Sequence, residues 1–89
     1  MEKTLKRAFG FHTYYEIWCR DEKQCQKRVR KIKDIFSGYE RANKFICQTK
    51  HINFKEGTKY VICVDAPGSV WKDIIQELDI VKRDPLNWD

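Results

Sequence analysis

Residues 11–20 constrain the fold most, because polar and apolar side chains alternate there with a period of two. Such alternation, in a run rich in aromatic and β-branched residues, is typical of a β-strand with one buried face. The face expected to meet the core consists of Phe11, Thr13, Tyr15, Ile17 and Cys19. The opposite face carries His12, Tyr14, Glu16, Trp18 and Arg20. We therefore expect a strand whose second face is aromatic and charged.

The period changes after this strand, which predicts a helix beginning near Asp21. Asp21 is a suitable N-cap, and Gly38 is placed to end the helix as a C′ glycine. Apolar residues at spacings of four, three and four share one face of this helix: Cys25, Val29, Ile32 and Phe36. The rest of its surface is basic and carries Lys23, Lys27, Arg28, Arg30, Lys31 and Lys33. We expect the apolar stripe to be buried.

The middle of the chain predicts a hairpin. One strand is expected within 44–55, with its best support at 44–49, and Glu56-Gly57 indicates a turn. Residues 59–64 are almost continuously apolar, which is typical of a central strand.

A second helix and a short last strand are expected after this hairpin. Pro67-Gly68 interrupts the chain, and Ser69 can act as an N-cap. The apolar stripe of this helix would consist of Trp71, Ile74, Ile75 and Leu78. Residues 80–83 favour a final strand, which Pro85 would end.

The predicted order of elements is β-α-β-β-α-β. Two right-handed β-α-β crossovers around a hairpin give the ferredoxin-like architecture, a four-stranded antiparallel sheet with both helices on one face. The first strand would be central in that sheet. We expect 1–89 to form a single α+β domain, with 1–8 and 85–89 loosely ordered.

Positive charge is concentrated in one part of the chain. Residues 1–64 carry fifteen Lys and Arg against seven Asp and Glu, a balance of +8, whereas 65–89 carry three against six, a balance of −3. Such asymmetry is typical of a protein that meets an anionic partner, although a merely soluble surface is the competing interpretation.

The four cysteines show no spacing typical of a zinc site or a disulfide framework. They are Cys19, Cys25, Cys47 and Cys63. The N-terminal residues carry charge without an apolar stretch, so we expect no export signal, a cytoplasmic location and reduced thiols. No apolar run is long enough to span a bilayer, and we expect neither metal nor cofactor.

No catalytic motif is recognisable. The four glycines are scattered, which excludes a glycine-rich phosphate loop, and the nucleophile-elbow and metalloprotease signatures are missing. A cysteine that meets His12 or His51 in the folded protein is the remaining route to a small cysteine-dependent enzyme. We expect a non-enzymatic protein without catalytic or metal-binding residues.

Two surfaces carry the functional prediction. Tyr14 and Trp18 on the open sheet face, beside Arg20, suit base stacking and phosphate contact, as in single-strand RNA readers. The consensus of such readers is absent from 59–64, so this is an analogy at the level of the fold. The helix would add positive charge through Lys23, Lys27, Arg30 and Lys31. We predict a binding module for an anionic partner, either nucleic acid or a phosphate-bearing small ligand.

Protein–protein interaction is the alternative. An exposed patch of Tyr and Trp is often buried by a second copy of the chain or by another protein. On this hypothesis the chain is a small adaptor or inhibitor, accessory or virus-encoded, that docks through its sheet. We also expect a homo-oligomer, a dimer or larger, formed through the same face.

Overall fold

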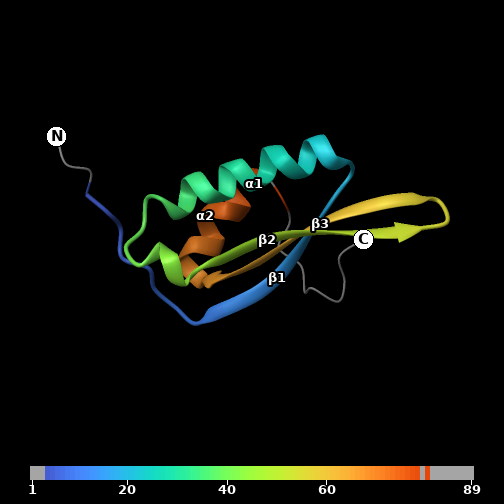
Figure 1. The fold of residues 1–89 in the computed structure, drawn as a ribbon. Coiled ribbons are helices and arrows are strands. Elements are labelled where there is room, and N and C mark those ends of the chain that lie inside the picture. Colours follow the sequence, from blue (N-terminus) through green and yellow to red (C-terminus); the bar gives the residue numbers. More distant parts are fainter. Residues whose placement is uncertain (1–3, 79, 81–89) are drawn as a thin grey trace.

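The computed structural model describes residues 4–78 and 80. Figure 1 shows two layers, an antiparallel sheet and two helices that pack on one of its faces. The elements are β1 (His12–Cys19), α1 (Glu22–Phe36), the short 3-10 helix η1 (Ala42–Lys44), β2 (Ile46–Phe54), β3 (Gly57–Pro67) and α2 (Gly68–Leu78). The α+β class is therefore confirmed.

The sheet has three strands among the described residues, in the order β1-β3-β2, and both pairings are antiparallel. The predicted four-stranded ferredoxin-like sheet is therefore wrong. Ile80 belongs to the expected last strand at 80–83, but its amide donates to the carbonyl oxygen of Ile75 at 3.3 Å, which turns it back onto α2. Residues 81–83 lie outside the described residues. β3 is central, as predicted, whereas β1 lies at an edge instead of in the centre.

The alternation in β1 has the predicted phase. Ile17 and Cys19 are buried on the face that the helices cover, and Ile17 lies opposite Ile62 of β3. Phe11 was expected in the core but is 92% exposed. The reason is local: β1 begins only at His12, and Gly10, with a φ of 99°, turns the chain just before it.

The core lies between the helices and the covered face of the sheet. Its fully buried aliphatic residues are Ile17, Ile32, Ile62, Val64, Val70 and Ile74. Trp71 joins α2 to β1, because its Nε1 donates to the carbonyl oxygen of Thr13 at 2.8 Å. The Trp71 ring also meets the ring of Tyr15 edge-on at 4.9 Å. Burial of Trp71 and Ile74 confirms the stripe of α2.

Helix α1 begins as predicted and ends differently. Asp21 is its N-cap, with Oδ1 accepting a hydrogen bond from the Gln24 amide at 2.8 Å. The C-cap is Ser37, and Gly38 does not have a positive φ, so it is not a left-handed C′ glycine. Cys25, Ile32 and Phe36 are buried. Val29 is only partly buried, because a groove opens beside it.

Ser69 does not cap α2 as predicted, because it lies inside the helix and binds the N-terminal segment. Its Oγ accepts a hydrogen bond from the Phe9 amide at 2.8 Å, and its own amide donates to the Phe9 carbonyl at 3.0 Å. The chain passes very close to α2 here: a Cβ on Gly10 would lie 3.2 Å from the Gly68 nitrogen. Glycine at position 10 permits this approach.

The β2–β3 hairpin turns where the sequence predicted. Phe54 pairs with Gly57 across a loop of two residues, and Gly57 has a φ of 137° that few other residues adopt. The hairpin extends past the N-terminal end of α1, so its outer half has no helix above it (Figure 1). The burial of β3 changes accordingly: the residues before Tyr60 are exposed, whereas Val61 and Ile62 are buried.

Candidate binding groove between α1 and the β2–β3 hairpin

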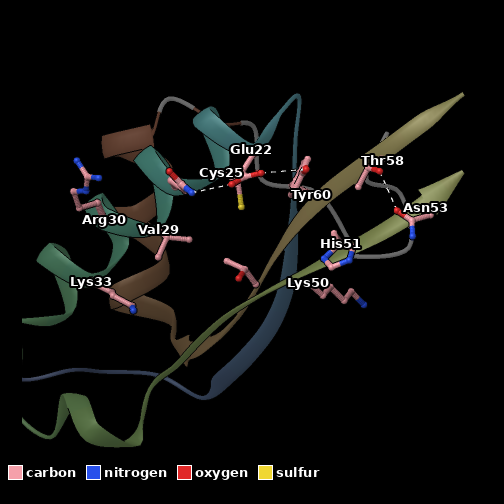
Figure 2. A pocket seen from close by; sticks show the side chains of 12 residues that line it. Glu22, Cys25, Val29, Arg30, Lys33, Lys50, His51, Asn53, Thr58 and Tyr60 are labelled. Atoms are coloured by element: carbon pink, nitrogen blue, oxygen red, sulfur yellow. Dashed lines mark hydrogen bonds between the residues drawn. The ribbon is translucent and has the colours of Figure 1, made fainter.

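A groove of about 770 Å³ lies where the hairpin leaves the helix (Figure 2). One wall belongs to α1 and consists of Glu22, Cys25, Gln26, Val29, Arg30 and Lys33. The other wall belongs to the hairpin and consists of Thr49, Lys50, His51, Asn53, Thr58 and Tyr60. Its volume lies in the range typical of small-molecule sites.

The groove has both polar and apolar lining, and basic residues outnumber its one acidic residue. Glu22 is the one carboxylate among its lining residues, and it is already engaged at one end. Tyr60 Oη donates to Glu22 Oε2 at 3.3 Å, and Gln26 Nε2 donates to Glu22 Oε1 at 3.1 Å. Desolvation, followed by the Glu22 charge, raises the pKa of Tyr60. The rest of the groove presents Arg30 and Lys33 without a neighbouring acid on its walls.

A second, shallower hollow of about 620 Å³ lies on the outer side of α1. It is lined by Lys27, Arg30, Lys31, Lys33, Asp34 and Ser37. Arg30 and Lys33 line both hollows, so the groove and the outer side of α1 form one continuous basic surface. None of the ion pairs found among the described residues involves a basic residue of α1.

The structure brings together the helical part of the predicted site. Lys27, Arg30 and Lys31 line one hollow, and Lys23 is exposed near the start of the same helix. Arg20 lies in the bend before α1, where its Nε is 3.4 Å from Asp21 Oδ2. The Arg20 charge therefore has an acidic neighbour, although both side chains remain exposed.

The aromatic part of the predicted site lies on the other face of the sheet. Tyr14 is 47% exposed, and its Oη donates to Glu16 Oε2 at 2.8 Å. Lys50 Nζ binds the same oxygen at 2.9 Å, and this hydrogen bond is the main cause that lowers the pKa of Glu16. Trp18 is partly buried, with its ring 6.4 Å from that of Phe54. Because α1 covers the opposite face, these rings and the basic helix cannot form one surface.

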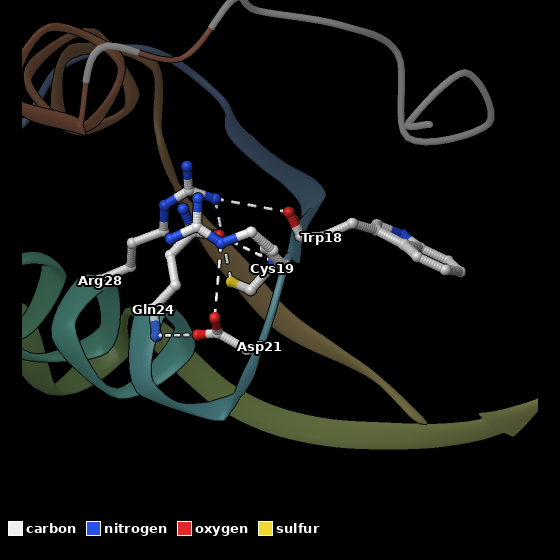
Figure 3. A network of polar contacts seen from close by, with 6 residues as sticks. Trp18, Cys19, Asp21, Gln24 and Arg28 are labelled. Atoms are coloured by element: carbon white, nitrogen blue, oxygen red, sulfur yellow. Dashed lines mark hydrogen bonds and ion pairs between the residues drawn. The ribbon is translucent and has the colours of Figure 1, made fainter. Parts of the chain in front are cut away.

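Arg28 is basic but has a structural role. Its Nη1 donates to the Trp18 carbonyl oxygen at 3.4 Å and contacts Cys19 Sγ at 3.9 Å (Figure 3). These contacts hold α1 against the outer edge of β1. Arg28 therefore does not belong to the basic surface defined by the two hollows.

Three of the four thiols lie in surroundings that disfavour the thiolate. Burial raises the pKa of Cys19 and of Cys47 to about 11, and it also raises the pKa of Cys25. Nucleophilic cysteines need a lowered pKa instead. Cys25 and His51 line the same groove, yet no hydrogen bond joins them in the described part of the chain. No group of three or more potential metal ligands occurs among residues 4–78 and 80 either.

The sequence reasoning missed Lys33 and the hairpin wall of the groove. Lys33 was assigned to the basic helix surface but not to the site. His51 was not placed at all, because its orientation depends on pairing with Tyr60 across the hairpin. Counting residues back along both strands from the Glu56-Gly57 turn would have placed His51 and Tyr60 on the same face of the sheet.

Comparison with known proteins adds no assignment. No family model, curated protein or solved structure matches this chain. Within the described residues, neither helix is long and apolar enough to cross a membrane.

Proposed function

We propose that this protein is a non-catalytic module that binds a phosphate-bearing partner through the groove and the outer side of α1. The observation that carries this proposal is the position of Arg30 and Lys33. They line both hollows and have no acidic partner among the described residues. Arginine and lysine beside hydrogen-bonding groups such as Thr49 and Gln26 are well suited to phosphate oxygens.

A nucleic-acid strand fits this surface better than a single phosphate group does. Basic residues follow one another from Lys23 to Lys33 without an intervening acid, which at 1.5 Å per residue is a distance of about 15 Å. Phosphates of one strand follow one another at about 3.4 Å along a duplex axis, so several can lie beside α1. Stacking on Tyr14 or Trp18 would need a separate contact on the opposite face.

The decisive experiment is a double charge reversal on the outer side of α1. Lys27→Glu with Lys31→Glu should weaken the binding of a fluorescein-labelled single-stranded RNA several-fold, as measured by fluorescence anisotropy. The slope of log K against log salt should become shallower by about 1.4, because two single-strand phosphate contacts are lost. Lys55→Glu with Lys59→Glu on the hairpin is the matched control, since it changes the net charge equally and leaves α1 intact.

Duplex RNA, single-stranded DNA and a nucleoside triphosphate complete the set of probes. Competition by the triphosphate alone would point to a small phosphate ligand in the groove. An equal loss of affinity in both double variants would mean that only net charge matters, and the proposed site would be wrong. Absence of binding to every phosphate probe at low salt would reject the function itself.

Protein binding through the open sheet face is the second candidate. Tyr14, Ile46 and Phe54 each expose 45–47% of their surface on that face. A contact of this kind would depend little on salt, in contrast to phosphate binding. For both candidates we propose a cytoplasmic location, where the four unpaired thiols would stay reduced.

A further inference from the structure

The outer edge of β2 carries backbone groups that lack a partner. Phe54 and Gly57 flank a loop of two residues, so they form a hydrogen-bonded pair, and such pairs alternate along the ladder. The even-numbered residues of β2 therefore bond to β3, while the odd-numbered residues turn N–H and C=O outward. These outward residues are Cys47, Thr49, His51 and Asn53. No hydrogen bond reaches their backbone groups within the described part of the chain.

The other edge of the sheet is less accessible. Trp18 lies opposite Val61, and the backbone groups of Val61 are already bonded to β2 on the other side. Trp18 therefore belongs to a pair that does not bond across β1 and β3, and its carbonyl points outward at the free edge of β1. The Arg28 guanidinium occupies this carbonyl at 3.4 Å. No comparable contact caps β2 among residues 4–78 and 80, and seven of its nine residues are exposed. An additional strand would therefore meet less obstruction at β2.

The sequence of β2 is complementary to itself in one antiparallel register. With Lys50 on a twofold axis, Thr49 of one copy lies opposite His51 of the other, and Cys47 lies opposite Asn53. All four outward residues then form hydrogen-bonded pairs. The same register places Ile46 opposite Phe54, so two apolar side chains that are each 45% exposed cover one another. A register centred on His51 would leave Cys47 and Ile46 outside the paired segment.

Lys50 is the one residue that opposes this register, because it would lie opposite its own copy. Like charges directly opposite each other are destabilising. Glu16 removes most of this penalty, since its Oε2 lies 2.9 Å from Lys50 Nζ within the same chain. Each copy would therefore bring a nearly neutral Lys50–Glu16 pair to the axis.

We propose that β2 pairs with β2 of a second copy of this chain in this register, which joins two three-stranded sheets into one sheet of six strands. The dimer is isologous, as expected for a symmetric pair. It does not depend on phosphate binding, because it uses the backbone edge of β2 and not the basic residues of α1. Thr49 and His51 line the groove, so pairing would place the grooves of the two copies side by side on one face of the sheet.

A proline at position 49 tests the pairing, because it removes an outward N–H without removing a bond to β3. Sedimentation velocity from micromolar to millimolar concentration should show a dimer for the parent protein. Thr49→Pro should raise the dissociation constant by more than about tenfold, because symmetry removes two hydrogen bonds from each dimer. Thr49→Val is the matched control, since it keeps the N–H at the same exposed position, and it should dimerise like the parent.

A second pair of variants tests the register without touching the backbone. Glu16→Gln leaves Lys50 uncompensated, so it should weaken the dimer at low salt and recover as salt screens the two lysines. Glu16→Gln combined with Lys50→Gln should restore dimerisation at low salt. The proposal would be overturned if the parent protein stayed monomeric over the whole concentration range. It would also be overturned if neither Thr49→Pro nor Glu16→Gln changed the dissociation constant of the dimer. Unchanged RNA binding by Glu16→Gln, whose side chain lies on the sheet face opposite the groove, would show that the phosphate site does not depend on the dimer.

Discussion

Truncation of Ile32 to Ala tests the placement of α1 on the sheet. Ile32 is fully buried in the core, and the substitution removes three carbon atoms. At about 0.8 kcal/mol for each buried carbon, the lost transfer free energy is about 2.4 kcal/mol. The cavity left behind brings the expected loss in the free energy of unfolding into the range of about 2–5 kcal/mol. For a domain of this size the thermal midpoint should fall by at least about 10 °C.

Val29→Ala is the matched control, because Val29 belongs to the same stripe but faces the groove and is only partly buried. It should lower the free energy of unfolding by about 1 kcal/mol or less. Both substitutions improve helix propensity slightly, so that contribution nearly cancels in the comparison. Urea unfolding followed by circular dichroism measures both values. Equal losses in the two variants would refute the assigned orientation of α1.

Two further predictions follow from the ionisable groups. The Lys50 hydrogen bond lowers the pKa of Glu16 in the folded protein, so its contribution to stability is present at neutral pH and is lost as the pH falls through that lowered pKa. Glu16→Gln should therefore reduce the fall in the free energy of unfolding at acid pH by less than about 1 kcal/mol. The same acid dependence in the variant and the parent would contradict this prediction. Burial raises the pKa of Cys19 and of Cys47 to about 11, so iodoacetamide at pH 8 should label them only after denaturant is added. Rapid labelling of the folded protein would show that these thiols are not buried.

The elements that sequence predicted well are those determined by neighbouring residues. Asp21 begins α1 because its side chain binds an amide three residues ahead. Ile17 and Ile32 are buried because alternation and helical spacing assign each a face within its own element. Gly57 turns the hairpin because its positive φ suits glycine. None of these features depends on which strand lies beside which.

Strand order and the composition of the site depended on contacts between distant residues. Ile80, where a last strand was expected to begin, bonds through its amide to Ile75 of α2 instead, and β1 lies at an edge of the sheet that the described residues form. Tyr14 and Trp18 were predicted to supply stacking for the same partner that the basic helix binds, yet α1 crosses the opposite face of the sheet. His51 faces the groove only because β2 folds back along β3 in one register.

The length of the hairpin relative to α1 has a consequence for local stability. Helices cover the sheet only near one end, so Ile62 and Val64 are enclosed while the ladder around Thr58 and Asn53 faces water on the helix side. Amide protons of β3 in the enclosed half, which are hydrogen-bonded to a neighbouring strand, should exchange with solvent only when the whole domain unfolds, whereas those near Gly57 can exchange through fraying of the hairpin alone. Both proposed binding surfaces include this less protected half. Binding of a nucleic-acid strand or of a second β2 would therefore slow the exchange of amide protons in the outer half of the hairpin. In the free protein, opening would begin at the loop.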